Sequence, residues 1–385
     1  MRRARIQLRR DTNATEPNSD ACPVLASFPA MRGTLHLALL PILLAACASG
    51  PASHTPHLVP EWAPAVGTMV VYPFALPDDL VRDLAAEAPL FVLVREQDRG
   101  AAEGKLGALG VAPAQVHFVP TKAQSPWTRD FGPHQLATSD GRIALVDHVF
   151  RGYPWVPADC RPEHIRYRMG RMRGEDDAVP DLAAALGLPT VTLPAVATGG
   201  NLLVDGGGRA FCTSAQIVEN HDLCDEAAYR ELLRTTLGIT HLVVLENTET
   251  FGIQHIDCWM KVIDPETLLV KQAPANHPEH APLERNVERL RQLVTPSGGR
   301  YRIVRIDCPP YADDLLPAYT NSLRLGRVVH VPLFGGDADE RALATYREVL
   351  PDCDVRGYRF DGWQHFDALH CRTRALHAVP SAAQR

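Results

Sequence analysis

The chain has 385 residues, of which 45% are hydrophobic and 22% charged, a composition ordinary for a globular protein with a sizeable core. This length suits two domains of common size or one large repetitive domain. The formal net charge of −6 argues against a general nucleic-acid-binding protein and is compatible with a cationic ligand.

The first 46 residues have the pattern of a targeting leader and not of a folded element. Residues 1–30 are polar and Arg-rich, and Met31-Arg32 then opens a short basic start followed by the apolar run 35–46. This run is shorter than the ~20 apolar residues that a membrane-spanning helix needs. Its layout is typical of a secretory signal, and we expect translation to start at Met31.

The residues that end this run predict a lipid anchor. Leu44-Ala-Ala-Cys47 resembles the lipobox of bacterial lipoproteins, whose cysteine is lipidated and becomes the first residue. We expect Cys47 to carry the anchor, residues 47–60 to form a tether and residues 61–380 to form the folded domain. The protein would then be exported and held at the bacterial cell envelope. An unprocessed leader on a cytosolic protein is the alternative.

Nine cysteines are spread along the chain without a Cys-x-x-Cys pair or a zinc-type spacing. Seven remain after the leader and the anchor, so in an oxidising compartment at least one stays free or pairs between chains. Cys212 and Cys258 lie in apolar strand patterns, and taken alone they are expected to be core thiols.

One unit of helix, short apolar strand and hairpin repeats about five times. The expected helices are residues 78–88, 179–187, 225–238, 282–294 and 337–350, and the strands after them are residues 90–94, 191–193, 241–246, 302–306 and 354–360. Turn sequences predict hairpins at residues 139–141, 205–207, 265–267 and 325–327. A fifth hairpin forms if residues 368–376 pair with the early strand 68–72, which would close a ring.

This repeat predicts an α/β fold, namely a five-bladed α/β propeller with pseudo-fivefold symmetry. A doubly wound sheet is the rival, but it places single strands between helices and not hairpins.

Five polar clusters fall at strand ends or in the loops beside them. They are Trp127-Thr-Arg129-Asp130, Thr198-Gly199-Gly200-Asn201, His255-Ile-Asp257, Tyr319-Thr-Asn321 and His370-Cys371-Arg-Thr373. In a ring of repeats such loops converge at one end of the axis. His255 and Asp257 are two residues apart, so we expect both side chains on one face of a strand. Each cluster alone could be structural: an ion pair, a core His–Asp pair, a core thiol.

Together these residue types suit attack on a guanidinium group. A guanidinium is planar, cationic and carries five N–H donors, and two carboxylates, here Asp130 and Asp257, can hold it flat. A thiolate at Cys371 could then attack the central carbon, while His255 protonates the departing amine and activates a water. The carboxylates would raise the pKa of the thiol and a bound cation would lower it, so substrate-assisted deprotonation stays open.

The combined motifs resemble the bacterial, Porphyromonas-type peptidylarginine deiminase and agmatine deiminase family of the pentein guanidine-modifying superfamily. The likeness runs from Glu61-Trp62 to about residue 380. It implies the five-bladed propeller, a covalent thiouronium intermediate on Cys371, His255 as acid and base, the Asp130–Asp257 clamp, and Asn321 as an active-site residue. It implies no metal or organic cofactor. Residues expected to contact the substrate are Trp127, Arg129, Gly199, Gly200, Asn201 and Arg151.

The sequence leaves the substrate branch open. Agmatine deiminases usually carry a glutamate immediately before the Gly-Gly pair. This chain has Thr198 at that position, and in this respect it is similar to the secreted peptidylarginine deiminases. Those enzymes have two close arginines for a terminal carboxylate, whereas only Arg151 stands in the matching region, where it could equally be a surface arginine. The main hypothesis is hydrolysis of (peptidyl-)arginine to citrulline and ammonia. The alternatives are an agmatine deiminase giving N-carbamoylputrescine, or a lipoprotein that binds guanidines or peptides without turnover.

Two other motifs have simpler explanations. Gly206-Gly-Gly208 joins two expected strands and opens no helix, so it is a turn and not a phosphate loop. His277-Pro-Glu-His280 lacks a third ligand for zinc. No Gly-x-Ser-x-Gly motif of a serine hydrolase is present.

Overall fold

The computed structural model describes residues 55–167 and 172–378. The expected leader 1–46 with Met31, the expected anchor Cys47, most of the expected tether 47–60, and residues 168–171 and 379–380 of the expected domain 61–380 lie outside the described residues. Residues Pro51–Arg385 belong to one compact unit. Among the described residues, no helix is both long and apolar enough to cross a membrane.

The described strands form five sheets of three or four strands and one two-stranded sheet. The first sheet has the order β19(Arg374–His377)-β2(Ala65–Val71)-β3(Leu90–Val94)-β4(Val116–Pro120), and the second β1(His57–Leu58)-β5(His134–Ala137)-β6(Ile143–Val149)-β8(Thr190–Val196). The other three are β9(Leu203–Val204)-β10(Arg209–Thr213)-β11(His241–Leu245), β13(Met260–Asp264)-β14(Thr267–Gln272)-β15(Arg302–Asp307) and β16(Leu323–Leu325)-β17(Val328–Leu333)-β18(Asp354–Arg359). The small sheet pairs β7(Val156–Pro157) with β12(Phe251–Gly252).

Each of the five larger sheets contains the same unit. An antiparallel pair is followed by a helical connection to a strand that lies parallel to the second member of the pair. The connecting helices are α1(Asp78–Glu87), α5(Ala178–Leu186), α7(Glu226–Leu237), α8(His280–Arg291) and α9(Asp337–Val349). The four predicted hairpins are confirmed, and the five predicted helices are confirmed to within three residues at either end.

Helix α7 shows why the repeat could be read from the sequence. The Asp225 side chain accepts a hydrogen bond from the Ala228 N–H and so caps the first turn. Tyr229, Leu233 and Leu237 are buried on one face, because residues four apart lie on the same side of a helix. Gly238 ends the helix at φ 69°, a left-handed conformation that glycine adopts without steric cost.

The end of the described chain completes the first sheet. Strand β19 lies antiparallel to β2, with Arg374 opposite Met69 and Ala375 opposite Thr68. This confirms the predicted pairing of the late segment with the early strand. The same sheet also has an unpredicted helix, α2(Arg99–Ala108), and an unpredicted strand, β4. Helix α2 buries only Ala102 and Leu106, so its apolar pattern is too sparse to be recognised in the sequence.

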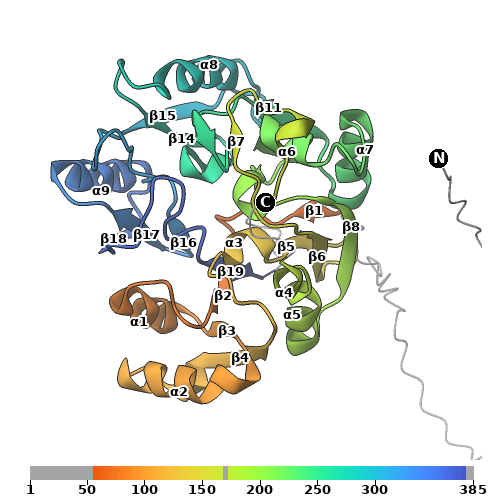
Figure 1. Cartoon of the computed structure of the whole chain (residues 1–385), viewed down its shortest axis with the longest axis vertical. Coiled ribbons are helices and arrows are strands. Elements are labelled where there is room, and N and C mark those ends of the chain that lie inside the picture. The colour runs from red at the N-terminus through yellow and green to blue at the C-terminus, as the bar shows by residue number, and fades with distance from the viewer. Residues whose placement is uncertain (1–54, 168–171, 379–385) are drawn as a thin grey trace, which may run out of the picture. The chain divides into compact units, whose positions relative to one another are not determined.

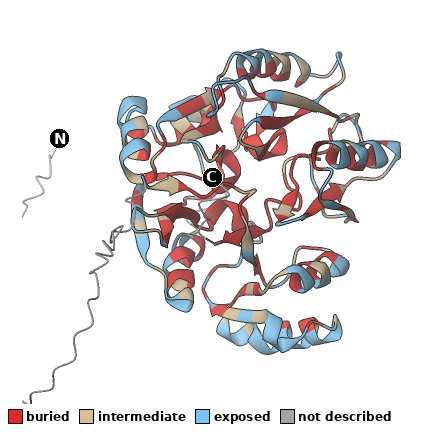
Figure 2. Cartoon of the chain, turned by 180° about the vertical axis from the view of Figure 1, so that it is seen from behind, coloured by how far each residue is buried: buried red, intermediate tan, exposed pale blue. Residues whose placement is uncertain are grey.

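The helices lie at the periphery of the unit, and the short helix α3(Thr128–Phe131) lies near its middle with β19 (Figure 1). The outer faces of the peripheral helices are exposed, while the strands and the loops toward the middle are largely buried (Figure 2). The hydrophobic core is divided into four clusters between neighbouring sheets and helices. The fold is therefore a mixed α/β fold of repeated hairpin sheets, with buried polar loops toward the centre.

Candidate active site

Five polar side-chain clusters occupy the same position in the five sheets. Each lies just before the first strand of an antiparallel pair, in the segment by which the chain enters that sheet. The residues are Asp130 in α3 before β5, Gly200 in the 3₁₀ turn Gly199–Asn201 before β9, Asp257 in the 3₁₀ turn Ile256–Cys258 before β13, Asn321 before β16 and Cys371 before β19. All five are buried. Residues far apart in the sequence are thus brought together by one repeated feature of the fold.

The prediction that His255 and Asp257 lie on one strand is wrong. His255 precedes a 3₁₀ turn, Ile256–Cys258, and strand β13 begins only at Met260. Both side chains nevertheless face the same space, because a Cβ placed on Gly200 would lie 2.9 Å from His255 Nδ1 and 3.1 Å from Asp257 Oδ2. Here a 3₁₀ turn, and not the alternation of side chains along a strand, places both side chains on the same side.

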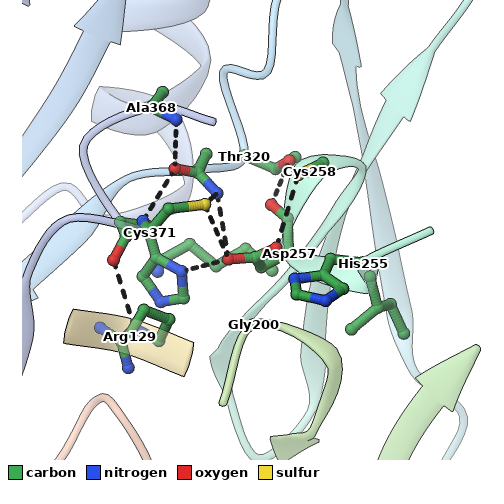
Figure 3. Close-up of polar contacts among 12 residues, drawn as sticks. Arg129, Gly200, His255, Asp257, Cys258, Thr320, Ala368 and Cys371 are labelled. Carbon is green, nitrogen blue, oxygen red and sulfur yellow. Dashed lines mark hydrogen bonds and ion pairs between the residues drawn. The ribbon is translucent and has the colours of Figure 1, made fainter. Parts of the chain in front are cut away.

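Cys371 lies among polar groups from three segments (Figure 3). Its Sγ atom is 3.2 Å from Asn321 Nδ2 and 3.7 Å from Asp257 Oδ2. Its main-chain N–H donates to Asn321 Oδ1 at 3.2 Å, and its carbonyl accepts from the Arg129 N–H at 3.0 Å. The side chain is 1% exposed. The thiol is therefore fixed on both its main-chain and its side-chain atoms.

Asp257 is the most connected carboxylate of the cluster. Its Oδ2 accepts from Asn321 Nδ2 at 3.0 Å and lies 2.7 Å from His370 Nδ1. The other ring nitrogen of His370 lies 2.5 Å from Glu61 Oε1. Burial raises the pKa of Asp257, but the hydrogen bond and charge of His370 outweigh it and leave this pKa lowered. Asp257 is therefore an anion in the unliganded site.

Asp130 approaches the same space from the second sheet. It accepts from the Tyr153 hydroxyl at 2.7 Å and from the Gly200 N–H at 2.9 Å, and its Oδ1 is 3.6 Å from His255 Nδ1. Burial raises the pKa of Asp130, and the nearby Asp257 anion adds to this. A cation placed between the two carboxylates would favour the ionised form of both.

Asp130, His255 and Asp257 all approach the main chain of Gly200 closely. A Cβ at this position would lie 2.6 Å from Asp130 Oδ1 as well as close to His255 and Asp257. Distances this short are contacts that any larger residue would have to displace. Because Gly200 has no side chain, the two carboxylates and the imidazole can pack close to its main chain and to one another.

The thiol of Cys371 is protonated when the site is empty. Burial raises its pKa to about 12, the anionic Asp257, Asp367 and Asp130 contribute, and a hydrogen bond from the Cys258 thiol opposes the shift. The sequence left this balance open. In the structure desolvation and negative charge prevail, and a positive charge placed beside Cys371 would favour its thiolate form.

The other predicted contact residues have more varied surroundings. Trp127 is half-buried and packs edge-on to Tyr153, with ring centroids 5.0 Å apart. Asn201 accepts from the Ile256 and Thr213 main-chain N–H groups, so it fixes the turn that carries Asp257.

Three further residues of this group differ in how near they lie to the reacting groups. Arg129 pairs with Glu61 at 2.7 Å and donates to the His370 carbonyl, and a Cβ on Gly199 would meet the Arg129 carbonyl at 2.0 Å. Both therefore hold the segments of the site together. Arg151 forms a two-pronged ion pair with Asp222 and is not brought into contact with the described Cys371–Asp257 cluster.

Several residues of the site were not identified as functional from the sequence. Glu61 joins His370, Arg129 and Lys261 through its two carboxylate oxygens, and no local pattern links it to these residues, of which His370 and Lys261 are 309 and 200 positions away. Tyr153 supports Asp130, and its only signal was an aromatic run after Arg151. Cys258 was expected to be a core thiol in a strand, but it lies in the turn beside Asp257, with Sγ 3.5 Å from Asp257 Oδ1. Cys212, by contrast, is a buried thiol in β10, as expected.

The fold matches solved structures over nearly their whole length. An agmatine deiminase of Enterococcus faecalis superposes with a TM-score of 0.70 at 18% identity and covers 84% of this chain and 96% of its own. A structure named "Putative Arginine Deiminase" from Porphyromonas gingivalis gives 0.70 at 21% identity, over 83% and 98% of the two chains. The mixed α/β fold is thus the fold of the pentein-type deiminases, the class of guanidine-modifying hydrolases that act on C–N bonds of amidines.

The sequence places the chain within this class. The model of the Porphyromonas-type peptidyl-arginine deiminase family matches residues 57–376, and the chain belongs to this family. A protein of Streptomyces coelicolor named "Putative agmatine deiminase" is 26% identical over 327 residues, which cover 78% of this chain and 92% of that protein. A protein of the same name from Selenomonas ruminantium is also 26% identical, over 78% of this chain and 89% of its own length.

Proposed function

We propose that the chain is an exported deiminase that hydrolyses the guanidino group of arginine, free or within a peptide, to citrulline and ammonia. The observation that carries this proposal is the meeting of four polar groups around Gly200. Asp130, His255 and Asp257 lie close to its main chain, and the Cys371 thiol lies 3.7 Å from Asp257. Two carboxylates, an acid–base group and a nucleophile that meet in this way suit a planar cation whose central carbon is attacked.

The first half-reaction begins when the guanidinium binds between Asp130 and Asp257. Its positive charge lowers the pKa of the Cys371 thiol, which is raised to about 12 in the empty site. The thiol proton passes by way of His255 to the nitrogen that leaves, and the sulfur forms a bond to the guanidinium carbon. Ammonia departs and a cationic thiouronium remains on Cys371.

In the second half-reaction a water takes the place of ammonia. His255 removes a proton from this water as its oxygen attacks the thiouronium carbon. The carbon–sulfur bond breaks as the added oxygen becomes the ureido carbonyl, and the neutral ureido product is released. One of the two protons of the water returns to the Cys371 sulfur, and the other leaves to solvent, where it protonates the ammonia. Asp257 keeps its negative charge throughout, since His370 and Asn321 hydrogen-bond to it, and it orients the substrate in both steps.

The substrate branch is proposed from the residue before the glycine pair. Thr198 is buried and carries no charge, whereas a substrate with a free amine tail would be held by an acidic residue there. This favours a peptide or amino-acid arginine over agmatine. The named agmatine deiminases among the relatives favour agmatine as the second candidate, with N-carbamoylputrescine as its product. Arg151 is engaged by Asp222, so a salt bridge from Arg151 to a terminal carboxylate would first require this pair to open.

The ring arrangement is part of the proposal. Five sheets of the same unit each send one polar loop toward the site, and β19 joins the last segment to the first sheet. We infer that they are the blades of the predicted five-bladed α/β propeller, with residues 61–380 as one catalytic domain.

The cellular location is proposed from the sequence alone. The lipobox-like Leu44-Ala-Ala-Cys47 would anchor the protein in the cell envelope through Cys47, with Met31 as the true start. Mass spectrometry of the mature protein from its native host tests this. A mature N-terminus upstream of Cys47 without a lipid would refute the anchor.

A substrate panel tests the reaction. Ureido groups and ammonia are measured with agmatine, free arginine and peptides with internal or terminal arginine. We expect turnover of the arginine substrates and loss of turnover in Cys371→Ser, because the hydroxyl is a poorer nucleophile, with the fold of the variant checked by circular dichroism. Turnover of agmatine alone would replace the first candidate by the second. Activity of Cys371→Ser near that of the wild type would refute the covalent mechanism, and a lack of any turnover would favour a binding protein.

A further inference from the structure

The cysteine next to Asp257 is not used by the reaction described above. Cys258 is buried, its Sγ lies 3.5 Å from Asp257 Oδ1, and it donates to the Phe366 carbonyl at 3.2 Å. Its thiol also hydrogen-bonds to Cys371. The sulfur atoms of Cys258 and Cys371 and a carboxylate oxygen of Asp257 all lie within 4.8 Å of one another. Two thiols and a carboxylate therefore converge on one point.

We infer that Cys258, Cys371 and Asp257 form a binding site for a thiophilic divalent cation such as Zn²⁺, which occupies the site in competition with the guanidinium. This cation would be an inhibitor and not a cofactor.

The distances fit the geometry of a tetrahedral zinc site. With Zn–S near 2.3 Å and Zn–O near 2.1 Å, two ligands at the tetrahedral angle are separated by about 3.6 Å for a sulfur–oxygen pair. The sulfur–oxygen distances in the structure are 3.7 Å from Cys371 to Asp257 Oδ2 and 3.5 Å from Cys258 to Asp257 Oδ1, so each thiol lies at this spacing from a different oxygen of the one carboxylate. Three protein ligands leave a fourth position for water, as in zinc sites that are open to ligands.

The charges around the site also favour a cation. Asp130 and Asp367 act on Cys371 together with Asp257, and the same negative field that attracts a guanidinium attracts a divalent ion more strongly. His370 Nδ1 lies 2.7 Å from Asp257 Oδ2, and a hydrogen bond of this kind from a second residue orients a metal-binding carboxylate. Binding requires both thiols as thiolates, so each Zn²⁺ would release two protons to solvent.

The cation binding itself does not depend on the proposed function. Its inhibitory effect does, because it follows from the capture of Cys371 as the nucleophile. The test therefore measures binding without substrate, so that a protein that turns over no guanidine can still confirm or refute the cation site.

The experiment uses chelator-treated, reduced protein with Zn²⁺ or Co²⁺ alone. We expect one Zn²⁺ per chain by competition with a chromophoric chelator, release of about two protons per ion, and a thiolate-to-cobalt charge-transfer band with Co²⁺. Cys258→Ser should weaken Zn²⁺ binding by at least about 10–100-fold, the loss that follows even a change behind the ligands. Cys308→Ser is the matched control, since Cys308 is also buried and donates to a main-chain carbonyl, that of Ile306, and it should bind as the wild type.

Two results would overturn the inference. One is equal Zn²⁺ affinity of folded Cys258→Ser and the wild type. The other is the lack of a thiolate band in the folded wild-type protein with Co²⁺, which decides the question even if Cys258→Ser does not fold. If the wild type turns over a guanidine, Zn²⁺ should also raise its apparent KM, and Cys258→Ser should lose this sensitivity when compared with its own metal-free rate.

Discussion

Cys371 owes its position to main-chain bonds as much as to its side chain. Asn321 accepts a hydrogen bond from the Cys371 N–H and donates one to the Cys371 sulfur, while the Arg129 N–H donates to the Cys371 carbonyl. Its reactivity has a different origin, the charge of the space in front of it. The hydrogen bonds of the protein thus fix the position of Cys371, whereas the charge of a bound ligand would set the ionisation of its thiol.

The protonation of Cys371 predicts an unusual alkylation profile. Its pKa is raised to about 12 by burial and neighbouring carboxylates, and the thiolate is the reactive form. The rate of alkylation by iodoacetamide in the native protein should therefore still rise by about tenfold per pH unit beyond pH 9. The rate is followed by mass spectrometry of the Cys371 peptide, with the same peptide in urea-unfolded protein as reference.

The raised pKa of Cys371 also makes the free energy of unfolding depend on pH. Above pH 9 the unfolded thiol loses its proton while the native thiol keeps it up to about pH 12. The unfolded state then binds fewer protons, so the contribution of Cys371 to the free energy of unfolding decreases as the pH rises through this window. A native alkylation rate that levels off near pH 9, as in urea, would contradict the raised pKa.

Replacing Asp130 by Asn should weaken binding and orientation of the guanidinium more than it weakens the fold. The amide would keep the size of the side chain, but the clamp would lose one charge. Removal of one partner of a buried charge pair costs an estimated ~2–5 kcal/mol. We expect kcat/KM to fall accordingly, with a thermal midpoint near that of the wild type, as measured by steady-state kinetics and calorimetry. Unchanged kcat/KM would exclude Asp130 from the clamp.

At the scale of elements, the residues of the candidate site lie in the turns that enter the sheets, and the buried core lies between the sheets and the helices. The 3₁₀ turn Gly199–Asn201 is an example of such a turn. Asn201 holds the next turn by its hydrogen bond from Ile256 N–H, and Gly200 allows Asp130, His255 and Asp257 to lie close together. A change in one turn thus affects the neighbouring turn without a change in either strand.

Gly200→Ala should abolish most activity while the protein remains folded. The added methyl group would lie 2.6 Å from Asp130 Oδ1 and 2.9 Å from His255 Nδ1, so it would displace both groups from the positions in which they are proposed to act on the guanidinium. The control is Gly104→Ala in α2, where a Cβ meets no atom within 4 Å and alanine favours the helix by about 1 kcal/mol. Kinetics and denaturant titrations of both variants are compared, and a Gly200→Ala enzyme with ordinary KM and kcat would show that the two groups do not act from these positions.

The elements were predicted better than the site that they form. Amphipathic spacing and turn residues indicated the helices and hairpins, because both are local in sequence. Helix α2 and strands β1, β7 and β12 were missed because they are short or weakly patterned and depend on partners elsewhere in the chain. Residue types alone led to the prediction of Cys371, Asp130, His255 and Asp257 as site residues, and the structure brings these four together. Glu61 and Tyr153 could not be found in this way, since only the folded chain brings them to these groups.

At the scale of the whole unit, the pairing of β19 with β2 links the two ends of the described chain. Leu376 is 2% exposed and belongs to the core cluster between the first two sheets. This strand also follows directly after Cys371. The stability of the closing pair and the position of the nucleophile are therefore coupled through a few residues of chain.

Leu376→Ala should lower the free energy of unfolding by about 2–5 kcal/mol, the cost of a cavity at a buried leucine. Val66→Ala on the partner strand is the control, because Val66 is 50% exposed and its truncation should change stability by no more than about 0.5 kcal/mol. Urea titrations followed by fluorescence measure both. Equal effects of the two variants would show that the closing strand is not part of the cooperative core.

The placement of one polar loop before each of the five sheets has a consequence for how the protein loses activity when it unfolds. A site that needs a contribution from every sheet is lost as soon as any one of them opens. In a denaturant series, catalysis should therefore disappear at or before the midpoint of the least stable sheet, ahead of the loss of helical signal. Residual activity would therefore report on the stability of the least stable sheet, whichever of the five sheets that is.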